Sequence, residues 1–520
     1  MTLRVWRFAP LLLLAACSRS PDTPATPAPA AQSQPAVSGA AAVPWFKGNV
    51  DAAFAEAKRA NKPLFLYWGA VWCPYCNQVK ATLFNRADFA ERARHFIPVE
   101  LDGDSPQGQK LAARFKVRGY PTMILFSPDG LELTRLPGEV DAQRYLQVLA
   151  LGMNANRPVK AVLADALAGK TLAPDDWRLL AYYAFDADEE QLIAKGRLAG
   201  TLAQLAAAVP PTEPELATRL ALKALSAQAE VSPQPAPGDA SGAGLLNHVL
   251  GDPALVRSHF DLLVANPAKM VTSLTVAGPE RVLLATRWDA ALAALAQDAT
   301  LSTADRLVAL GGRVALGELD GVSPVAVPAI KAQIQAADQA TTNRYERQSV
   351  IYTAAGVLTE AGLLDDSDTL LAAELKRSHA PYYFMRMLGS NAKKRGDTAS
   401  ALKWYEAAWD TAKGGATRLQ WGAGYVNGLL ELAPDEVVKI EAAASKLLSE
   451  AANTPNAFYE RNLGVLTRSA GKLAEWRKPG ARAAAHDRLI AQGKALCERL
   501  PRDDPQRAAC AGVFRPAKPG

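Results

Sequence analysis

The chain has few of the residues that build metal and phosphate sites. Its 520 residues include five histidines and five cysteines, and no two histidines lie at helical spacing. Beyond one Cys-x-x-Cys pair, no second pair of ligands is present that would complete a tetrahedral zinc site. A glycine-rich phosphate loop is also missing. The sequence therefore indicates neither a metal site nor a nucleotide-phosphate site.

Strong charge and long apolar runs are also lacking. The 58 basic and 52 acidic residues leave a net charge of +6, which is small for this length. No basic run is interleaved with aromatic residues, so nucleic acid is not an expected partner. No apolar run is long enough to span a bilayer as a permanent helix. The length alone suggests two to four domains.

The N-terminus has the pattern of an export signal. Arg4 and Arg7 precede a short apolar run at residues 8–14, and Leu-Ala-Ala then leads to Cys17. This ending resembles the bacterial lipobox, in which a signal peptidase cuts before a cysteine that carries lipid. We therefore expect residues 1–17 to be a lipoprotein signal peptide and lipobox, with lipid on Cys17. The alternatives are an ordinary signal peptide with an incidental cysteine, or a cytosolic N-terminus.

The residues after Cys17 predict where the protein is held. Ser18, rather than aspartate, follows the cysteine. In the proteobacterial lipoproteins that this pattern resembles, that choice implies the periplasm and the inner leaflet of the outer membrane. Residues 18–44 are rich in Pro, Ala, Ser and Gln and have almost no large apolar side chain. Such a segment cannot bury enough surface to fold, so a disordered tether is expected.

A dithiol lies at residues 72–76, in the sequence Trp-Cys-Pro-Tyr-Cys. The apolar, aromatic-rich run at 63–69 predicts a buried strand before it, and a helix is expected to begin at the pair. At such a junction, free backbone N–H groups and the positive helix end favour a thiolate. We therefore expect Cys73, the more exposed member, to be the nucleophile and Cys76 to be the resolving thiol. The alternative, half of a zinc site, lacks its second ligand pair.

The last two cysteines predict a separate structural disulfide. Cys497 and Cys510 flank Pro501 and Pro505, which would break a helix and let two short helical pieces lie side by side. An exported protein meets an oxidising compartment, where a disulfide between them is the natural state. The alternative is two unpaired thiols.

Residues 45–151 show an alternation of apolar strands and amphipathic helices. Ser-Pro-Asp-Gly at 127–130 predicts a hairpin turn, and Asp141 is a plausible N-cap for the closing helix. The expected elements are a helix at 50–60, a strand at 63–69, a helix at 73–93 that is broken near Asn85, a strand at 96–101, a helix at 106–115, strands at 121–127 and 131–136, and a helix at 141–151. A βαβ unit followed by a hairpin and a closing helix is the order of the thioredoxin fold.

Two segments of this domain, at 62–73 and 115–122, resemble the thioredoxin family. The similarity is greatest to the periplasmic domain of the transmembrane reductase DsbD and related exported modules, and it covers about a fifth of the chain. It implies that Cys73 attacks, that Cys76 resolves, and that Pro121 is a cis-proline packed against the dithiol; an ordinary trans proline is the alternative. The surround of the active site would be Trp72, Pro74, Tyr75 and Tyr120.

The domain departs from that family at two acidic positions. Tyr67 stands where thioredoxins usually have a buried aspartate, and Lys80 stands where the DsbD-type domain has a second acid. The proton of Cys76 would then pass to water or to another group, with Glu100 and Asp102 as candidates. The Pro-Tyr dipeptide between the cysteines resembles glutaredoxins, whose potentials are roughly −200 to −230 mV. The direction of electron flow stays open.

From about residue 155 the chain is rich in Ala and Leu at helical spacing. We expect a helical region at 155–230, a linker or loop at 231–244, and a tetratricopeptide-like helical region at 245–520. Helices are expected at 175–208, 212–230, 244–265, 280–297, 303–316, 325–339, 343–361, 366–376 and 381–395.

One unit of this region is clearer than the others. Residues 388–408, with a turn at Gly396, resemble a tetratricopeptide repeat. A lone repeat cannot bury its own face, so its neighbours would be degenerate repeats or an unrelated bundle. The aromatic residues between Tyr382 and Tyr425 indicate core packing, or alternatively a concave face that holds a partner.

Together these patterns predict an α/β thioredoxin fold followed by a large all-α domain. The expected function is that of a lipid-anchored, exported thiol–disulfide oxidoreductase that needs no cofactor and no metal. Its partners would be cysteine-containing protein substrates, an upstream redox partner, and the membrane through its lipid. A rival interpretation is a lipid-anchored assembly protein that uses the thioredoxin domain as a docking module. The intact dithiol counts against the rival, whereas Tyr67 and the large helical region count for it.

Overall fold

The computed structural model describes residues 42–515, except for 137–141, 156, 186, 189, 233 and 235–240. The described residues belong to one compact unit. Several expectations lie outside them: the signal peptide with Cys17, nearly all of the 18–44 tether, the N-cap at Asp141, and most of the 231–244 linker.

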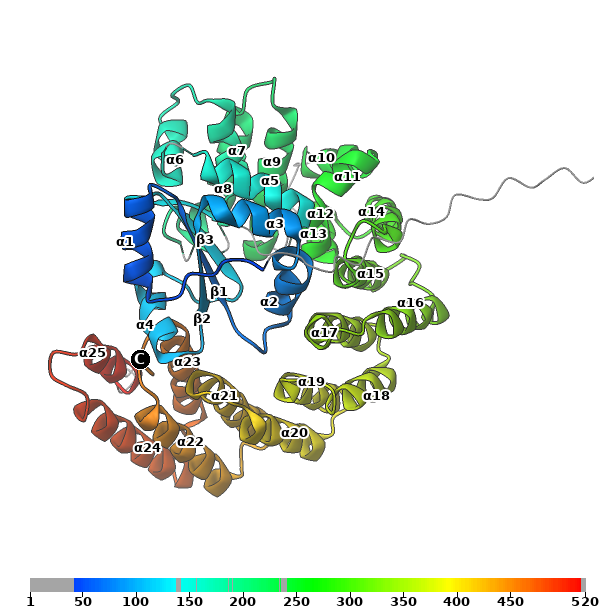
Figure 1. Ribbon diagram of the computed structural model, residues 1–520. Helices are drawn as coiled ribbons and strands as arrows, with labels where there is room; N and C mark the ends of the chain where they lie inside the picture. Colours follow the sequence, from blue (N-terminus) through cyan, green and yellow to red (C-terminus); the bar gives the residue numbers. More distant parts are fainter. Residues whose placement is uncertain are drawn as a thin grey trace, which may run out of the picture. The chain divides into compact units, whose positions relative to one another are not determined.

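Near the N-terminus, four strands form one sheet in the order β2-β1-β3-β4. They are β1 (Leu64–Gly69), β2 (Ile97–Asp102), β3 (Thr122–Phe126) and β4 (Glu132–Leu136). β1 runs parallel to β2 and antiparallel to β3, and β3 pairs with β4 as an antiparallel hairpin. This is the predicted thioredoxin fold (Figure 1).

Helices accompany the sheet at nearly the predicted boundaries. They are α1 (Val50–Ala60), α2 (Pro74–Val79), α3 (Ala87–Arg92), α4 (Pro106–Phe115) and α5 (Ala142–Met153), with a π-helical turn at Lys80–Phe84 and a 3₁₀ turn at Ala93–His95.

β1 lies at the centre of the domain and is buried along its whole length. Successive side chains of a strand point to opposite faces of the sheet. Accordingly, Phe65 and Tyr67 belong to one hydrophobic cluster, while Leu66 and Trp68 belong to another that includes Phe115 of α4. The predicted buried strand before the dithiol is therefore confirmed, and a hydrophobic cluster packs against each of its faces.

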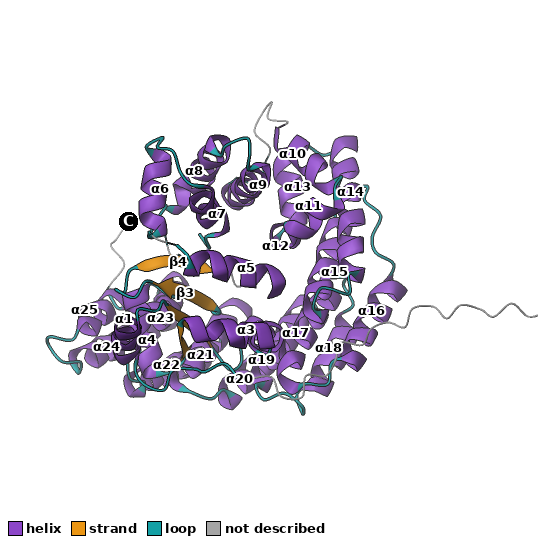
Figure 2. Ribbon diagram, turned by 45° about the horizontal axis from the view of Figure 1, so that its top comes forward, coloured by secondary structure: helices purple, strands orange, loops and turns teal. Residues whose placement is uncertain are grey.

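The remainder of the described chain is helical (Figure 2). Its helices are α6 (Val159–Leu167), α7 (Pro174–Tyr182), α8 (Lys195–Ala208), α9 (Pro214–Val231), α10 (Ser241–Leu250), α11 (Pro253–Ser258), α12 (Phe260–Ala265), α13 (Pro267–Leu274), α14 (Pro279–Gln297), α15 (Thr303–Gly317), α16 (Val327–Ala340), α17 (Arg344–Glu360), α18 (Leu364–Glu374), α19 (Pro381–Lys394), α20 (Thr398–Thr411), α21 (Gly415–Leu432), α22 (Val437–Asn453), α23 (Glu460–Trp476), α24 (Ala481–Glu498) and α25 (Pro505–Val513). The predicted large all-α region is thus present.

The helix expected at 175–208 is wrong, because the chain forms two helices there. After α7 the backbone leaves the helix and runs beside β4, where Ala184 N donates to Arg135 O at 3.1 Å. The buried Arg135 guanidinium donates in turn to Ala187 O at 2.8 Å and to Lys116 O at 3.0 Å. This tertiary pairing overrides the helical pattern of the sequence.

The helix expected at 244–265 is likewise divided, into α10, α11 and α12. Asp252 caps α11 through its side chain, which accepts from Ala254 N at 2.8 Å. Pro253 follows at the first helical position, where its missing N–H costs nothing. A cap and a proline together start a new helix at this point.

α19 and α20 pack against each other and are joined by a turn in which Gly396 has φ of 77°. Gly389 lies so close to Tyr405 that an added Cβ would come within 2.5 Å of the ring. The small residue therefore lets the two helices approach closely, as expected. The likeness to a tetratricopeptide repeat stays a prediction.

Within the described part of the chain, no helix combines the length and the apolar character needed to cross a bilayer.

Candidate active site at the Cys73–Cys76 dithiol

Cys73 and Cys76 lie where β1 ends and α2 begins, as free thiols. Cys73 is the N-cap of α2, and its Sγ accepts a hydrogen bond from Cys76 N at 3.1 Å. This is the contact that a thiolate at the start of a helix would use. Both side chains are nearly inaccessible, with Cys73 3% exposed and Cys76 0% exposed.

Pro121 stands beside the dithiol, just before β3. The Tyr120–Pro121 bond is cis, which confirms that expectation. The Cys73 thiol donates to Tyr120 O at 3.6 Å. Cys73, Tyr120 and Pro121 are thus brought together, although 47 residues separate Cys73 from Tyr120.

The indole N–H of Trp72 binds an acidic residue, Asp104, that was not expected at the site from the sequence. Its indole Nε1 donates to Asp104, in the loop between β2 and α4. The same carboxylate oxygen of Asp104 accepts from the hydroxyl of Thr417 on α21. Asp104 therefore joins the dithiol segment, residues 72–76, to the helical region through one oxygen atom.

Side chains of the helical region also form hydrogen bonds with the backbone carbonyls just before Cys73. Gln348 of α17 donates from Nε2 to Trp72 O at 3.2 Å, and His379 Nε2 is hydrogen-bonded to Val71 O at 2.8 Å. Within the thioredoxin domain, Asn77 Nδ2 donates to Val71 O at 2.8 Å. The carbonyls just before Cys73 are therefore fixed from both parts of the chain.

Aromatic rings of the helical region cover the dithiol segment. Tyr383 of α19 stacks on Trp72, with ring centroids 5.4 Å apart, and Trp421 of α21 meets Trp72 edge-on at 6.2 Å. Tyr75, also in the dithiol segment, meets Tyr352 of α17 at 6.5 Å. Part of the aromatic run between Tyr382 and Tyr425 thus packs on the dithiol segment. The run was the sequence signal for this contact, but it could not show which surface the rings would meet.

A cavity of about 950 Å³ opens beside the dithiol. Cys73, Pro74 and Tyr75 line one side of it, and side chains of α19, α21 and α23 line the other. Arg461 of α23 stands at this wall, with its guanidinium 5.0 Å from the Trp72 ring and 4.6 Å from the Tyr120 ring. The cavity is thus shared between the thioredoxin domain and the helical region.

The environment of Cys73 differs from the thiolate-favouring site expected of a helix N-terminus. Burial raises the pKa of the Cys73 thiol well above its ordinary value, and the neighbouring Cys76 thiol raises this pKa further. The hydrogen bond from Cys76 N and the charge of Arg461 act in the opposite direction. Burial outweighs them because the helical region excludes water from the sulfur.

Tyr67 and Lys80 stand at the two positions where the related domains have acids, and Glu100 and Asp102 are the candidates to replace those acids. The Tyr67 hydroxyl is buried without a hydrogen-bond partner among the described residues, and burial with the nearby thiols raises the pKa of Tyr67. Lys80 Nζ pairs with Glu100 Oε1 at 2.5 Å and lies 5.8 Å from the centre of the Tyr67 ring. Burial raises the pKa of Asp102, the other candidate. No hydrogen bond joins Glu100 or Asp102 to Cys76 in the described structure.

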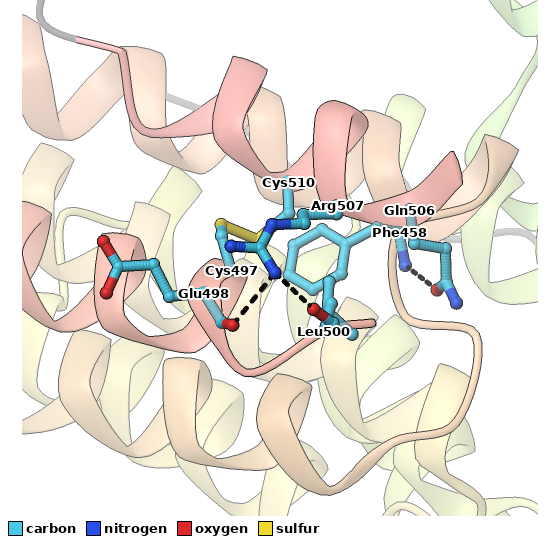
Figure 3. The surroundings of a disulfide bond; sticks show 7 residues. All are labelled: Phe458, Cys497, Glu498, Leu500, Gln506, Arg507 and Cys510. Atoms are coloured by element: carbon cyan, nitrogen blue, oxygen red, sulfur yellow. Dashed lines mark hydrogen bonds between the residues drawn. A yellow bond between two sulfur atoms is a disulfide. The ribbon is translucent and has the colours of Figure 1, made fainter. Parts of the chain in front are cut away.

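Far from this dithiol in sequence, Cys497 of α24 and Cys510 of α25 form a disulfide, with Cα atoms 5.5 Å apart. Figure 3 shows Arg507 beside it, donating to Leu500 O at 2.7 Å and to Glu498 O at 3.2 Å. The turn between the two helices is therefore held by covalent and hydrogen bonds. The pairing expected from the cysteine count is present.

Comparison with known proteins matches the same α/β segment. A family model described as a thioredoxin-like domain covers residues 50–152. The thiol:disulfide interchange protein DsbD of Pseudomonas fluorescens is 33% identical over 96 residues, which are 18% of this chain and 16% of that protein. The disulfide bond reductase DsbH of Chlamydia pneumoniae is 27% identical over 99 residues, covering 16% of this chain and 57% of DsbH.

A smaller relative is matched over most of its own length. The thioredoxin of Mycobacterium bovis is 36% identical over 101 residues, which are 19% of this chain and 83% of that thioredoxin. The segment that the family model matches, residues 50–152, is the one that folds into the four-stranded sheet and carries Cys73, Cys76 and the cis bond before Pro121. Through this domain, the chain belongs to the thioredoxin family.

Proposed function

We propose that the protein is a thiol–disulfide oxidoreductase that acts on protein cysteines through Cys73 and Cys76. The observation that carries this proposal is the position of Cys73 Sγ, 3.1 Å from Cys76 N and beside Tyr120 O at the cis bond. The two relatives described above, a thiol:disulfide interchange protein and a disulfide bond reductase, agree with it. The chain spans only 16% of the length of the DsbD protein, so the similarity supports the chemistry of one domain.

The reaction follows from two neighbouring thiols. The Cys73 thiolate attacks one sulfur of a substrate disulfide, and the other substrate sulfur leaves as a thiolate. The mixed disulfide on Cys73 is then attacked by the Cys76 thiolate, which releases the second substrate sulfur. Two electrons pass to the substrate, and Cys73–Cys76 becomes a disulfide that an upstream dithiol partner reduces. Every step is reversible, so the same residues serve in oxidation.

The resolving step needs an acceptor for the Cys76 proton. Because Tyr67 occupies the position of the usual buried aspartate, we assign the acceptor role to Glu100, reached through water. Its salt bridge to Lys80 Nζ, at 2.5 Å, holds the Glu100 side chain on the side of the domain where Lys80 lies over the Tyr67 ring. The Tyr67 hydroxyl, which has no other described partner, would donate to the Cys76 thiolate as it forms.

The helical region is proposed to select the substrate. Its contacts fall on the dithiol segment itself, through Tyr383 and Trp421 against Trp72 and through Gln348 to the Trp72 carbonyl. A substrate that reaches Cys73 therefore meets helical side chains as well as the thioredoxin domain. We further propose export, lipidation of Cys17, and residence on the inner leaflet of the outer membrane, from the signal-like N-terminus alone.

Trapping of mixed disulfides tests the redox proposal. A Cys76→Ala variant retains the attacking thiol and should accumulate covalent complexes with cysteine-containing proteins in cells. A Cys73→Ala variant should accumulate none, because the remaining thiol is completely buried. Equal trapping by both variants, or trapping by neither, would contradict the assignment.

A second function is favoured by the burial of the dithiol. Cys73 is only 3% exposed, as expected if the thioredoxin domain served as a docking module within an assembly protein. A turnover assay separates the two functions, since a docking module would not cycle electrons.

A further inference from the structure

The route by which a substrate can reach Cys73 is narrow. Trp72 is stacked on Tyr383, Tyr75 meets Tyr352, and the Trp72 carbonyl is bonded to Gln348. Cys73 retains an opening into the cavity of about 950 Å³ described above. The rigid surface of a folded protein cannot enter such a cleft to reach Cys73 Sγ, whereas an extended chain can.

The walls of this cleft carry an excess of positive charge. Its lining includes Arg118, Arg386, Arg461 and Arg468 and one carboxylate, Glu460. That carboxylate already pairs with Arg118 at 2.9 Å and lies 4.0 Å from Lys116 Nζ.

Three of the arginines lack an acidic partner. Within the described ranges, no carboxylate pairs with Arg386, Arg461 or Arg468, since Arg461 donates to the neutral Gln420 at 2.6 Å and Arg386 lies over the Trp421 ring at 5.4 Å. Arg386 and Arg468 are exposed. The opening therefore offers uncompensated cations to an anionic ligand.

Unused hydrogen-bonding groups line the same wall. The Trp421 indole N–H, the Gln420 side-chain NH₂ and the Asn427 Oδ1 are buried and have no partner among the described residues. Trp421 is itself 6% exposed. A buried polar atom without a partner loses its hydrogen bonds to water and gains none in return, so such atoms point to a ligand that pairs with them. Two of the three are N–H donors, which suit the carbonyl and carboxylate oxygens of a peptide.

The space beside α21 and before the cis bond also suits a backbone. A Cβ atom added at Gly424 of α21 would have no other atom within 4 Å. The same is true of Gly119, which lies before the cis bond. Both line the cleft. Absent side chains at these positions leave room for a main chain to lie across the wall toward Cys73.

We propose that the cleft binds an extended, acidic segment of a protein, whose cysteine is presented to Cys73. The proposal deepens the proposed redox function and rests on it. Arg386 and Arg468 attract the acidic flanks, Trp421 and Gln420 donate to the segment's oxygens, and Arg461 stands between the segment and the Trp72 ring.

Matched peptides test this proposal on the reduced full-length protein. Three peptides of equal length carry one cysteine as a mixed disulfide with a chromogenic thiol, and its flanks are glutamate, serine or lysine. We expect the second-order rate constant for reduction of the acidic peptide by the reduced protein, in a single turnover, to exceed that for the basic one by about tenfold or more at low salt, and the ratio to shrink as salt screens the charges. An Arg386→Glu/Arg468→Glu variant should bring the two rates to within about threefold.

Controls separate charge at the cleft from charge in general. An Arg197→Glu/Arg502→Glu variant alters two exposed arginines outside the cleft lining by the same total charge, and it should keep the wild-type preference. Melting curves of both variants establish that they are folded.

Each failure has a distinct meaning. Reduction of all three peptides at equal rates would overturn the acidic cleft while leaving the redox function intact. Reduction of none would overturn the redox function itself. Glutathione disulfide reduced as fast as the acidic peptide, and blocked by the same variant, would assign the cleft to a small acidic thiol and overturn the peptide proposal.

Discussion

The indole of Trp72 and the ring of Tyr383 stack with centroids 5.4 Å apart and planes inclined by 20°. Trp72 belongs to the dithiol segment, whereas Tyr383 lies 311 residues later, on α19. The helical region is therefore part of the immediate surroundings of the dithiol. The reactivity of Cys73 should depend on side chains outside the thioredoxin domain.

Removal of the Tyr383 ring tests this dependence. A Tyr383→Ala variant should react several-fold faster with iodoacetamide at Cys73, because the ring no longer covers the dithiol segment. It should also lose roughly 1 kcal/mol of stability with the aromatic pair. Val438→Ala on α22, at a side chain that is 83% exposed, is the control and should behave as wild type. An unchanged alkylation rate in Tyr383→Ala would show that the stacking does not protect Cys73.

The pH dependence of Cys73 alkylation follows from its burial. Because burial raises the thiol's pKa above the ordinary value of 9.0, only a small fraction is thiolate at neutral pH. The alkylation rate of the reduced protein should therefore continue to rise with pH beyond 9.0. Measurement with the Cys76→Ala variant as a comparison separates the two thiols. A plateau reached below neutral pH would indicate a stabilised thiolate and contradict the buried site.

His259 should make stability depend on pH in the acidic range. It is fully buried, both its ring nitrogens lack described partners, and burial with the charge of Arg219 lowers its pKa to about 4. The unfolded chain binds a proton at His259 with the ordinary pKa of 6.5, whereas the folded chain does not bind it until the pH is near 4, so stability falls as pH drops from 6.5 toward 4. The loss from this group is on the order of 3 kcal/mol.

Denaturant unfolding of wild type and a His259→Leu variant at a series of pH values measures this effect. The difference in unfolding free energy between the two proteins isolates the histidine from the carboxylates that also titrate. The variant should lose less stability than wild type over this interval. Parallel losses in both proteins would show that His259 is protonated without penalty in the fold.

The disulfide between Cys497 and Cys510 should contribute to the stability of α24 and α25. Its loop, with a sequence separation of 13, is expected to stabilise the fold by about 3 kcal/mol. Replacing both residues with serine in a Cys73→Ala/Cys76→Ala background leaves no other pair in the described chain to confuse the comparison. Calorimetry should show a lower melting temperature for the helical region. Two free thiols at these positions in non-reduced protein, detected by mass spectrometry, would contradict the bond.

The sequence predicted those features that depend on local patterns. The buried β1, the turn at 127–130, and α14 to α19 follow from hydrophobic period and turn residues, and the structure has them close to the expected boundaries. The cis bond at Pro121 followed from its resemblance to a family motif, and not from any local propensity.

Features that depend on contacts between distant parts of the chain could not be predicted in this way. Nothing near residue 184 indicates that Ala184 would pair with Arg135, so the helix there was expected to continue. In the same way, the contacts of Tyr383, Trp421 and Arg461 with Trp72 could not be predicted from the sequence. These contacts depend on how distant helices pack. The low thiol pKa expected of a helix N-terminus was wrong for the same reason, since the covering helices bury Cys73.

Steady-state turnover by the full-length protein is the most direct test of the central claim. An unfolded protein that contains a disulfide and a reductant that regenerates the Cys73–Cys76 dithiol are supplied, and the product thiols are counted per enzyme molecule. We predict many turnovers for wild type, none for Cys73→Ser, and at most one covalent event for Cys76→Ala. The absence of turnover by wild type whose Cys73 and Cys76 are verified as free thiols would contradict the account.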